Sequence, residues 1–201
     1  MAALGELLFY SGFRRPSLSD ALRYNLENGV PKAVDALLDS NFQTKNDAQL
    51  GVEIVSKCQA NALVLKLDHA RGGASEILLN YESRWGERAQ VKGLRITKEI
   101  PFDGDAALWQ LQPSAYDLNP PRAEIRSSKV ILGMDVPETQ SEDAISYIEE
   151  TIRKIGNYIE RQAQEIADHN SQLPQAAAQA IARRRATLSK VDNIAKRLTG
   201  H

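Results

Sequence analysis

Apolar residues return at alternating intervals of three and four positions along residues 145–166, and isoleucine fills nearly every one of these positions. Such an alternation places the apolar side chains on one stripe of a helix, as at positions a and d of a coiled-coil heptad. A second stripe with similar spacing covers residues 181–198, and Pro174 stands between the two. Because proline lacks a backbone donor and disfavours helical geometry in the residue before it, one helix should end there. The pattern therefore predicts two long antiparallel helices, a helical hairpin over residues 137–201.

The two stripes define a coiled-coil-like seam. Its residues are Ile145, Ile148, Ile152, Ile155, Ile159, Ile166, Ile181, Leu188 and Val191. Pairing of the two helices within one chain is the most economical arrangement, although an amphipathic helix packed on a sheet also explains the first stripe. Arg184 interrupts the second stripe, so apolar surface would stay uncovered unless an acidic or amide side chain meets this arginine. A homodimer through the helical hairpin is therefore an open alternative.

Short helices are predicted in the N-terminal third. The first begins at Ser17 and ends at about Asn28, because Gly29 suits the left-handed residue that terminates many helices. Pro31 suits the first turn of a second helix, and a third begins near Asn46. The apolar run that opens the chain contains an acidic residue and follows no basic one. It predicts a short core segment rather than a signal peptide or a membrane span.

The periodicity changes to that of strands after residue 61. Strand-like runs cover residues 62–68, 76–81, 89–96, 98–102, 122–126 and 129–136. The stretch A-R-G-G-A-S between the first two runs has turn chemistry, so these runs predict a hairpin. No helix long enough for a parallel crossover separates the runs, which favours an antiparallel meander of five or six strands. The predicted fold class is α+β, with an α+β body at residues 1–136 and the helical hairpin at residues 137–201.

The composition narrows the class of protein. The 25 basic and 26 acidic residues give a net charge of -1, so no long-range field draws the whole chain to nucleic acid or to an anionic membrane. Cys58 is the only cysteine, which rules out an internal disulfide and suits a reducing compartment. A cytoplasmic protein without membrane contact is the expectation.

Candidate chemistry is sparse. Asp68 and His69 lie beside a glycine pair at the predicted hairpin tip, which would suit acid–base chemistry or a metal. Without a second histidine, a cysteine or a carboxylate at a defined spacing, a plain turn explains them more simply. The metal-binding triplet of many nucleases, a phosphate-binding glycine loop, a nucleophile elbow and paired C-x-x-C motifs do not occur. We therefore predict no catalytic residue, cofactor, metal or small-molecule ligand.

Basic residues gather near the C-terminal end of the sequence. The candidate nucleic-acid contacts are Arg183, Arg184, Arg185 and Lys190, and Lys196 and Arg197 follow them. A basic helix face is where non-specific phosphate contacts begin, so a nucleic-acid-binding module is the alternative function. A solvated face that pairs with the acidic residues of the preceding helix is the simpler interpretation, and we favour it.

Three stretches carry a resemblance to known proteins. They are P-S-L-S-D-A-L-R-Y-N-L-E-N-G-V-P-K-A-V-D-A-L-L-D, then N-P-P-R-A-E-I-R, then a helical region that ends in A-I-A-R-R-R. In this order they resemble the N-terminal region of a poorly characterised group of bacterial proteins. Members of that group continue into a restriction-endonuclease-like domain and are thought to act on foreign DNA.

The resemblance implies a role in support of a nuclease. The nuclease domain would be expected to begin after His201, so the resemblance transfers no catalytic residue to this chain. It implies a regulatory, oligomerising or sensing module. Together with the apolar seam, it predicts a non-catalytic interaction or oligomerisation module.

Overall fold

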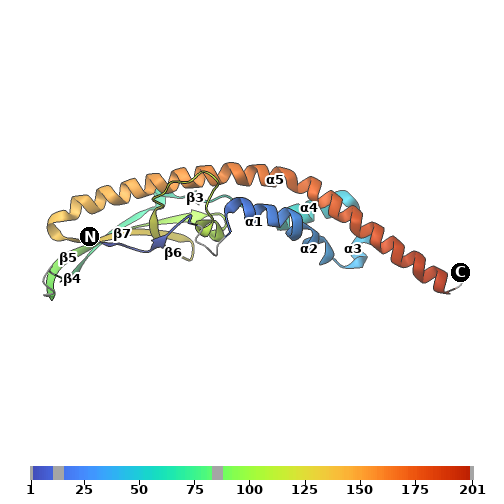
Figure 1. Cartoon of the computed structure of the whole chain (residues 1–201), viewed down its shortest axis with the longest axis horizontal. Coiled ribbons are helices and arrows are strands. Elements are labelled where there is room, and N and C mark those ends of the chain that lie inside the picture. The colour runs from blue at the N-terminus through green and yellow to red at the C-terminus, as the bar shows by residue number, and fades with distance from the viewer. Residues whose placement is uncertain (1, 11–15, 83–87, 200–201) are drawn as a thin grey trace. The chain divides into compact units, whose positions relative to one another are not determined.

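The computed structural model describes residues 2–10, 16–82 and 88–199, which form two compact units. The sheet unit comprises Met1–Leu18 and Ala62–Ala163, and the helical unit comprises Ser19–Asn61 and Gln164–His201. Each unit contains part of the long helix α5 (Ser141–Thr199), which runs from yellow-orange to red in Figure 1. None of the helices in the described ranges combines the length and the apolar character that crossing a bilayer requires.

The sheet unit is built on one antiparallel sheet. Its strands are β1 (Ala2–Ala3), β2 (Glu6–Leu7), β3 (Val64–Leu65), β4 (Arg71–Glu82), β5 (Arg88–Asp103), β6 (Arg122–Arg126) and β7 (Lys129–Pro137). Their order is β2-β6-β7-β5-β3, with β1 pairing on β7 and β4 pairing on β5. Every pair is antiparallel. The predicted α+β class and antiparallel sheet are confirmed, although the described residues form seven strands instead of five or six.

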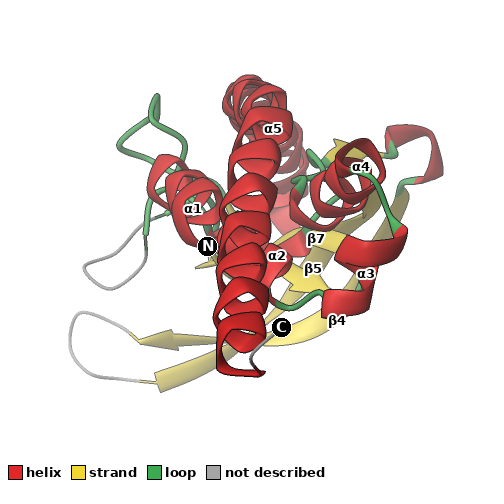
Figure 2. Ribbon diagram, turned by 90° about the vertical axis from the view of Figure 1, so that its right-hand side faces the viewer, coloured by secondary structure: helices red, strands yellow, loops and turns green. Residues whose placement is uncertain are grey.

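One face of the sheet is apolar and lies against α5. Ile100, Val130, Leu132 and Val136 occupy alternating positions of two paired strands, so they share this face, and all four are buried. Figure 1 shows the part of α5 that belongs to the sheet unit running along the sheet, and Figure 2 distinguishes the strands (yellow) from the helices (red). Three 3-10 turns join the strands and the helix. They are η2 (Leu67–His69), η3 (Ala106–Gln110) and η4 (Glu138–Gln140).

Four aromatic side chains complete the core of the sheet unit. The rings of Phe9 and Tyr158 stack with centroids 5.0 Å apart, and Trp109 lies 5.3 Å from Phe9 and 5.1 Å from Phe102. The Tyr158 hydroxyl donates to the Asp117 carbonyl and accepts from the Asp117 N–H, each at 3.0 Å, and burial raises its pKa. The N-terminal run is thus a core segment as predicted, and residues 11–15 lie outside the described ranges.

The first hairpin differs from the prediction. β4 and β5 pair continuously from Arg71–Glu99 to Glu82–Arg88, so Gly72 and Gly73 lie within a strand and the predicted turn is wrong. The two runs predicted between residues 89 and 102 form the single strand β5. Contact between distant parts of the chain explains the difference. Glycines permit a turn, but here the backbone N–H and C=O groups of this segment form hydrogen bonds with β5, which a turn would not allow.

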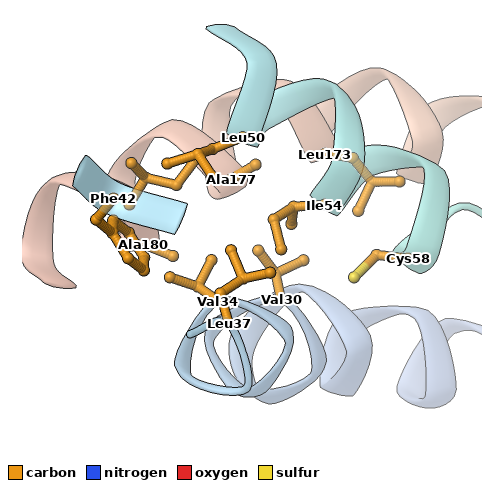
Figure 3. Close-up of a cluster of buried hydrophobic side chains, with 11 residues drawn as sticks. Val30, Val34, Leu37, Phe42, Leu50, Ile54, Cys58, Leu173, Ala177 and Ala180 are labelled. Atoms are coloured by element: carbon orange, nitrogen blue, oxygen red, sulfur yellow. The ribbon is translucent and has the colours of Figure 1, made fainter. Parts of the chain in front are cut away.

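The helical unit packs short helices on the second half of α5. They are α1 (Leu18–Tyr24), the π-helical turn η1 (Asn25–Gly29), α2 (Val30–Asp35), α3 (Asp39–Thr44) and α4 (Asp47–Cys58). Apolar side chains of α2, α3 and α4 and of the residues between them form one buried cluster with those of α5 (Figure 3). Its residues are Val30, Val34, Leu37, Phe42, Leu50, Ile54, Cys58, Leu173, Ala177, Ala180 and Ile181.

Two predicted helix boundaries in this unit have different outcomes. α4 begins where predicted, because the side chains of Asn46 and Gln49 each accept a hydrogen bond from the other residue's N–H. The break predicted at Gly29 is wrong, since α1, η1 and α2 follow one another directly and Gly29 has a right-handed φ of -64°. Val30 and Val34 are fully or nearly fully buried. Their burial favours continued helix over the termination that glycine permits.

The predicted helical hairpin is wrong, because α5 is one helix of 59 residues with Pro174 inside it. Proline within a helix costs about 3 kcal/mol, since it removes one hydrogen bond and its ring meets the preceding turn. Leu173, Ala177 and Ile181 are fully buried on either side of it. Their burial, at about 25 cal/mol per Å² of apolar surface, offsets that cost, whereas a reversal at Pro174 would remove them from the cluster.

Candidate interaction surface at the end of α5

The predicted seam residues are distributed over buried and exposed positions of α5. Ile148, Ile155, Ile166 and Ile181 are buried, Ile152, Ile159 and Leu188 are half-buried, and Ile145 and Val191 are exposed. The chain therefore covers most of the seam with its own sheet and short helices. Only its two ends remain open to a second molecule.

Gln162, which interrupts the isoleucine stripe, holds η3 in the sheet unit. Its side chain is 1% exposed, and its Nε2 donates to the Leu108 carbonyl at 2.9 Å and to the Leu111 carbonyl at 2.7 Å. Both carbonyls belong to the segment that carries Trp109. The polar residue in the seam is thus a donor to two main-chain acceptors.

Two of the predicted nucleic-acid contacts are used inside the helical unit. Arg184 forms an ion pair with Asp39 at 2.8 Å, and Arg185 forms one with Asp47 at 2.6 Å. Arg185 also donates to the Phe42 carbonyl at 2.7 Å and to the Lys45 carbonyl at 3.0 Å. Arg183 and Lys190 are exposed. The structure therefore does not bring the four basic residues together as one free patch.

The last turns of α5 carry apolar side chains that the described residues do not cover. Residues 189–199 are all exposed, and among them Val191 is 56%, Ile194 57% and Leu198 83% exposed. With Leu188 these residues form the terminal stripe, which follows the spacing of a helix face. Ile194 was not among the predicted seam residues, because a strict three-and-four alternation passes through Ala195 instead.

A groove adjoins the terminal stripe. It lies between α3 and the end of α5, has a volume of about 490 Å³, and its apolar lining is Phe42, Leu188 and Val191. Asp192 and Lys196 are among its polar lining residues, so it offers both signs of charge. Concave apolar surface beside an exposed apolar helix face is the arrangement that a partner helix needs.

The Asp68–His69 pair forms no larger site. His69 Nδ1 lies 2.9 Å from Asp68 Oδ2, and both side chains are well exposed. The hydrogen bond from His69 lowers the pKa of Asp68. Within the described ranges no three His, Cys, Asp or Glu side chains are grouped to hold a metal ion. The pair has the geometry of a surface contact in η2.

His169 is a buried ionisable group in the helical unit. It is 3% exposed, and neither ring nitrogen has a hydrogen-bond partner within the described part of the chain. Burial lowers its pKa below the ordinary value of 6.5, and the backbone of Cys58 opposes this shift without forming a well-aligned hydrogen bond. The folded helical unit therefore favours the neutral imidazole.

We expect the free energy of unfolding to fall as the pH is lowered from 7 to 5. The unfolded chain binds a proton at His169 near pH 6.5, whereas the folded chain binds it only at a lower pH, so acid favours unfolding. Urea unfolding followed by circular dichroism should show a smaller pH dependence for His169→Leu than for the wild type. His69→Leu, which changes an exposed histidine, should keep the full dependence, and an equal slope in His169→Leu would contradict the assignment.

Comparisons with known proteins find no match for this chain. No protein-family model matches it, and neither does any curated protein or solved structure. The resemblance to the bacterial group therefore rests on the three stretches quoted above.

Proposed function

We propose that the chain is a non-catalytic interaction module that self-associates through the terminal stripe, Leu188, Val191, Ile194 and Leu198. The observation that carries the proposal is the exposure of three large apolar side chains on the last turns of a continuous helix. Isolated apolar residues are common on protein surfaces, but a row of them along one helix face is typical of a binding surface.

The charges near the terminal stripe are compatible with helix pairing. If Leu188 and Val191 are placed at positions a and d of a heptad, Lys190, Lys196 and Arg197 fall at positions b and c. These positions point away from a partner helix, so two basic helix ends can approach without burying like charges. The stripe covers about three helical turns, so we expect association at about micromolar concentration rather than an obligate dimer.

Val191→Asp is expected to abolish self-association. The wild-type chain should show a mass above that of the monomer in light scattering at high protein concentration, and the variant should remain monomeric, because pairing would bury an uncompensated carboxylate. The variant should keep the helix content and melting temperature of the wild type, since Val191 is exposed in the single chain.

Ala186→Asp is the matched control for that experiment. It introduces the same charge one or two turns earlier on an exposed position that falls at f in the same heptad. This variant should associate like the wild type. A wild-type chain that stays monomeric at every concentration would sink the proposal.

Nucleic-acid binding is the alternative function. It would have to rely on Arg183, Lys190, Lys196 and Arg197, because the other two arginines form ion pairs within the unit. Retention of labelled DNA or RNA at low salt that weakens steeply as salt is added would favour this alternative. Absence of binding at low salt would exclude it.

The resemblance suggests where such a module would operate. A self-associating unit next to a nuclease domain would bring nuclease domains together or regulate them, as the bacterial group suggests. We therefore propose a regulatory role in a bacterial nuclease-type defence protein. This part of the proposal is supported only by the quoted stretches, and it does not depend on catalysis by this chain.

A further inference from the structure

β4 is an edge strand with one unpaired side. It pairs with β5 over its whole length, and in the described ranges no backbone hydrogen bond reaches its other side. Residues 71–76 are all exposed. An edge of this kind presents a row of backbone donors and acceptors that fits another extended chain.

β4 lacks several of the features by which edge strands usually avoid pairing. It contains no proline and no lysine, and its register with β5 shows no bulge from Arg71 to Glu82. Natural edges are commonly blocked by such residues or by a covering segment. The regular, unblocked edge is therefore suited to accept a further strand.

A groove lies next to this edge, on the side of the sheet that faces α5. Its volume is about 530 Å³, and Ala74, Ile96, Ile145 and Ile148 supply its apolar lining. Gly72 also lines it, and a Cβ added at Gly72 would meet no atom within 4 Å. The missing side chain leaves room beside Ile145, which is itself 41% exposed.

We propose that β4 accepts an extended segment of a partner protein as an additional antiparallel strand, with a large apolar side chain of that segment opposite Gly72. The main chain of the segment would pair with the open edge, which is how sheet edges recognise extended peptides. Residues directly opposite each other in antiparallel strands share a face. The large side chain would therefore cover the glycine and enter the groove below α5.

The charges on β4 specify the segment further. Arg71 and Glu76 flank the small residues 72–75, and within the described part of the chain neither has an ion-pair partner. An antiparallel segment would place an acidic residue opposite Arg71, one position after its large apolar residue. It would place a basic residue opposite Glu76, four positions before that apolar residue. Opposite charges in such cross-strand pairs are favourable.

The probe is a fluorescein-labelled peptide with this pattern, S-K-T-V-T-F-E-V-S, and its binding to the full chain is measured by fluorescence anisotropy. We expect saturable binding that weakens by about tenfold when the lysine and glutamate of the peptide are exchanged. The double variant Arg71→Glu with Glu76→Lys should reverse this preference. Absence of saturable binding of either peptide to the wild-type chain would overturn the proposal.

Gly72→Val separates docking from folding. Valine favours strands and its Cβ has open space, so the variant should be at least as stable as the wild type. It should nevertheless lose peptide binding, because its side chain occupies the space at Gly72 that the large apolar side chain of the peptide would cover. Ser75→Val is the matched control, since Ser75 points to the opposite face of β4 and should leave binding unchanged.

Two results would contradict the proposed occupant. Peptide binding that survives Gly72→Val would show that the groove is not used. A change in the sedimentation of the chain on Gly72→Val, with Val191→Asp already present, would mean that a second copy occupies the edge. The Val191→Asp background keeps this experiment independent of the terminal stripe.

Discussion

Gln162→Leu is expected to lower the free energy of unfolding of the sheet unit by about 2–3 kcal/mol, because it removes two hydrogen bonds to buried main-chain carbonyls. The Leu108 carbonyl still accepts from the Leu111 N–H, so the larger part of the loss is expected from the Leu111 carbonyl. Leucine has a similar volume and fits an apolar surrounding, so the loss comes from the Leu108 and Leu111 carbonyls rather than from a cavity. Gln162 Oε1 has no partner in the described ranges, and its removal costs nothing in hydrogen bonds. The loss should therefore reflect the two bonds from Nε2.

Tryptophan fluorescence during urea unfolding measures this effect in the correct unit. Both tryptophans of the chain lie between residues 62 and 163, and Trp109 belongs to η3 itself. Gln164→Leu, an exposed position on the same helix, should change the midpoint little. A Gln162→Leu variant that keeps full stability and changes its oligomeric state would instead favour the heptad interpretation, in which a polar residue selects the partner.

The period of the isoleucine stripe explains why the seam prediction was only partly useful. A strict seven-residue repeat stays on one side only when helices supercoil, and on a straight helix it drifts by about 20° per heptad. In α5 the buried positions include Ala144, Thr151 and Tyr158, which each precede an isoleucine of the predicted seam. The average interval between buried positions is close to the about 3.6 residues of one helical turn. The buried face of the first part of α5 is therefore the face that packs on the sheet, and not one that packs on a second helix.

The remaining errors share one cause, which is contact between distant parts of the chain. Local chemistry correctly indicated the strands after residue 61 and the helix that begins near Asn46, because these depend on neighbouring residues. Proline at 174 and glycine at 29 permit an ending but do not impose it, and burial in the helical unit favours continuation. The Gly72–Gly73 pair indicates a turn from local sequence alone, because the strand that pairs with it is not adjacent in the sequence. The favoured interpretation pairs the basic residues with acidic residues of the preceding helix, whereas Arg184 and Arg185 form ion pairs with Asp39 and Asp47, which are distant in the sequence.

Arg185→Ala is expected to lower the free energy of unfolding of the helical unit by about 2 kcal/mol, mostly through its bonds to main-chain carbonyls. The Phe42 and Lys45 carbonyls lie at the C-terminal end of α3, where the last carbonyls of a helix lack partners within it. The ion pair with Asp47 adds less, because that carboxylate is mostly exposed. The guanidinium also lies 5.7 Å from the centre of the Phe42 ring.

Arg185→Lys tests whether the geometry or the charge of the guanidinium accounts for its contribution to stability. A lysine ammonium cannot direct donors to two carbonyls and a carboxylate from one planar group, so this variant should recover less than half of the loss. Arg183→Ala, an exposed arginine on the same helix, should leave the unfolding midpoint of circular dichroism unchanged. If Arg185 served nucleic acid instead, Arg185→Ala would weaken binding at low salt and leave stability intact. Loss of stability without a change in binding would place the arginine in the fold, and would leave the terminal stripe as the exposed feature of this helix that still needs a partner.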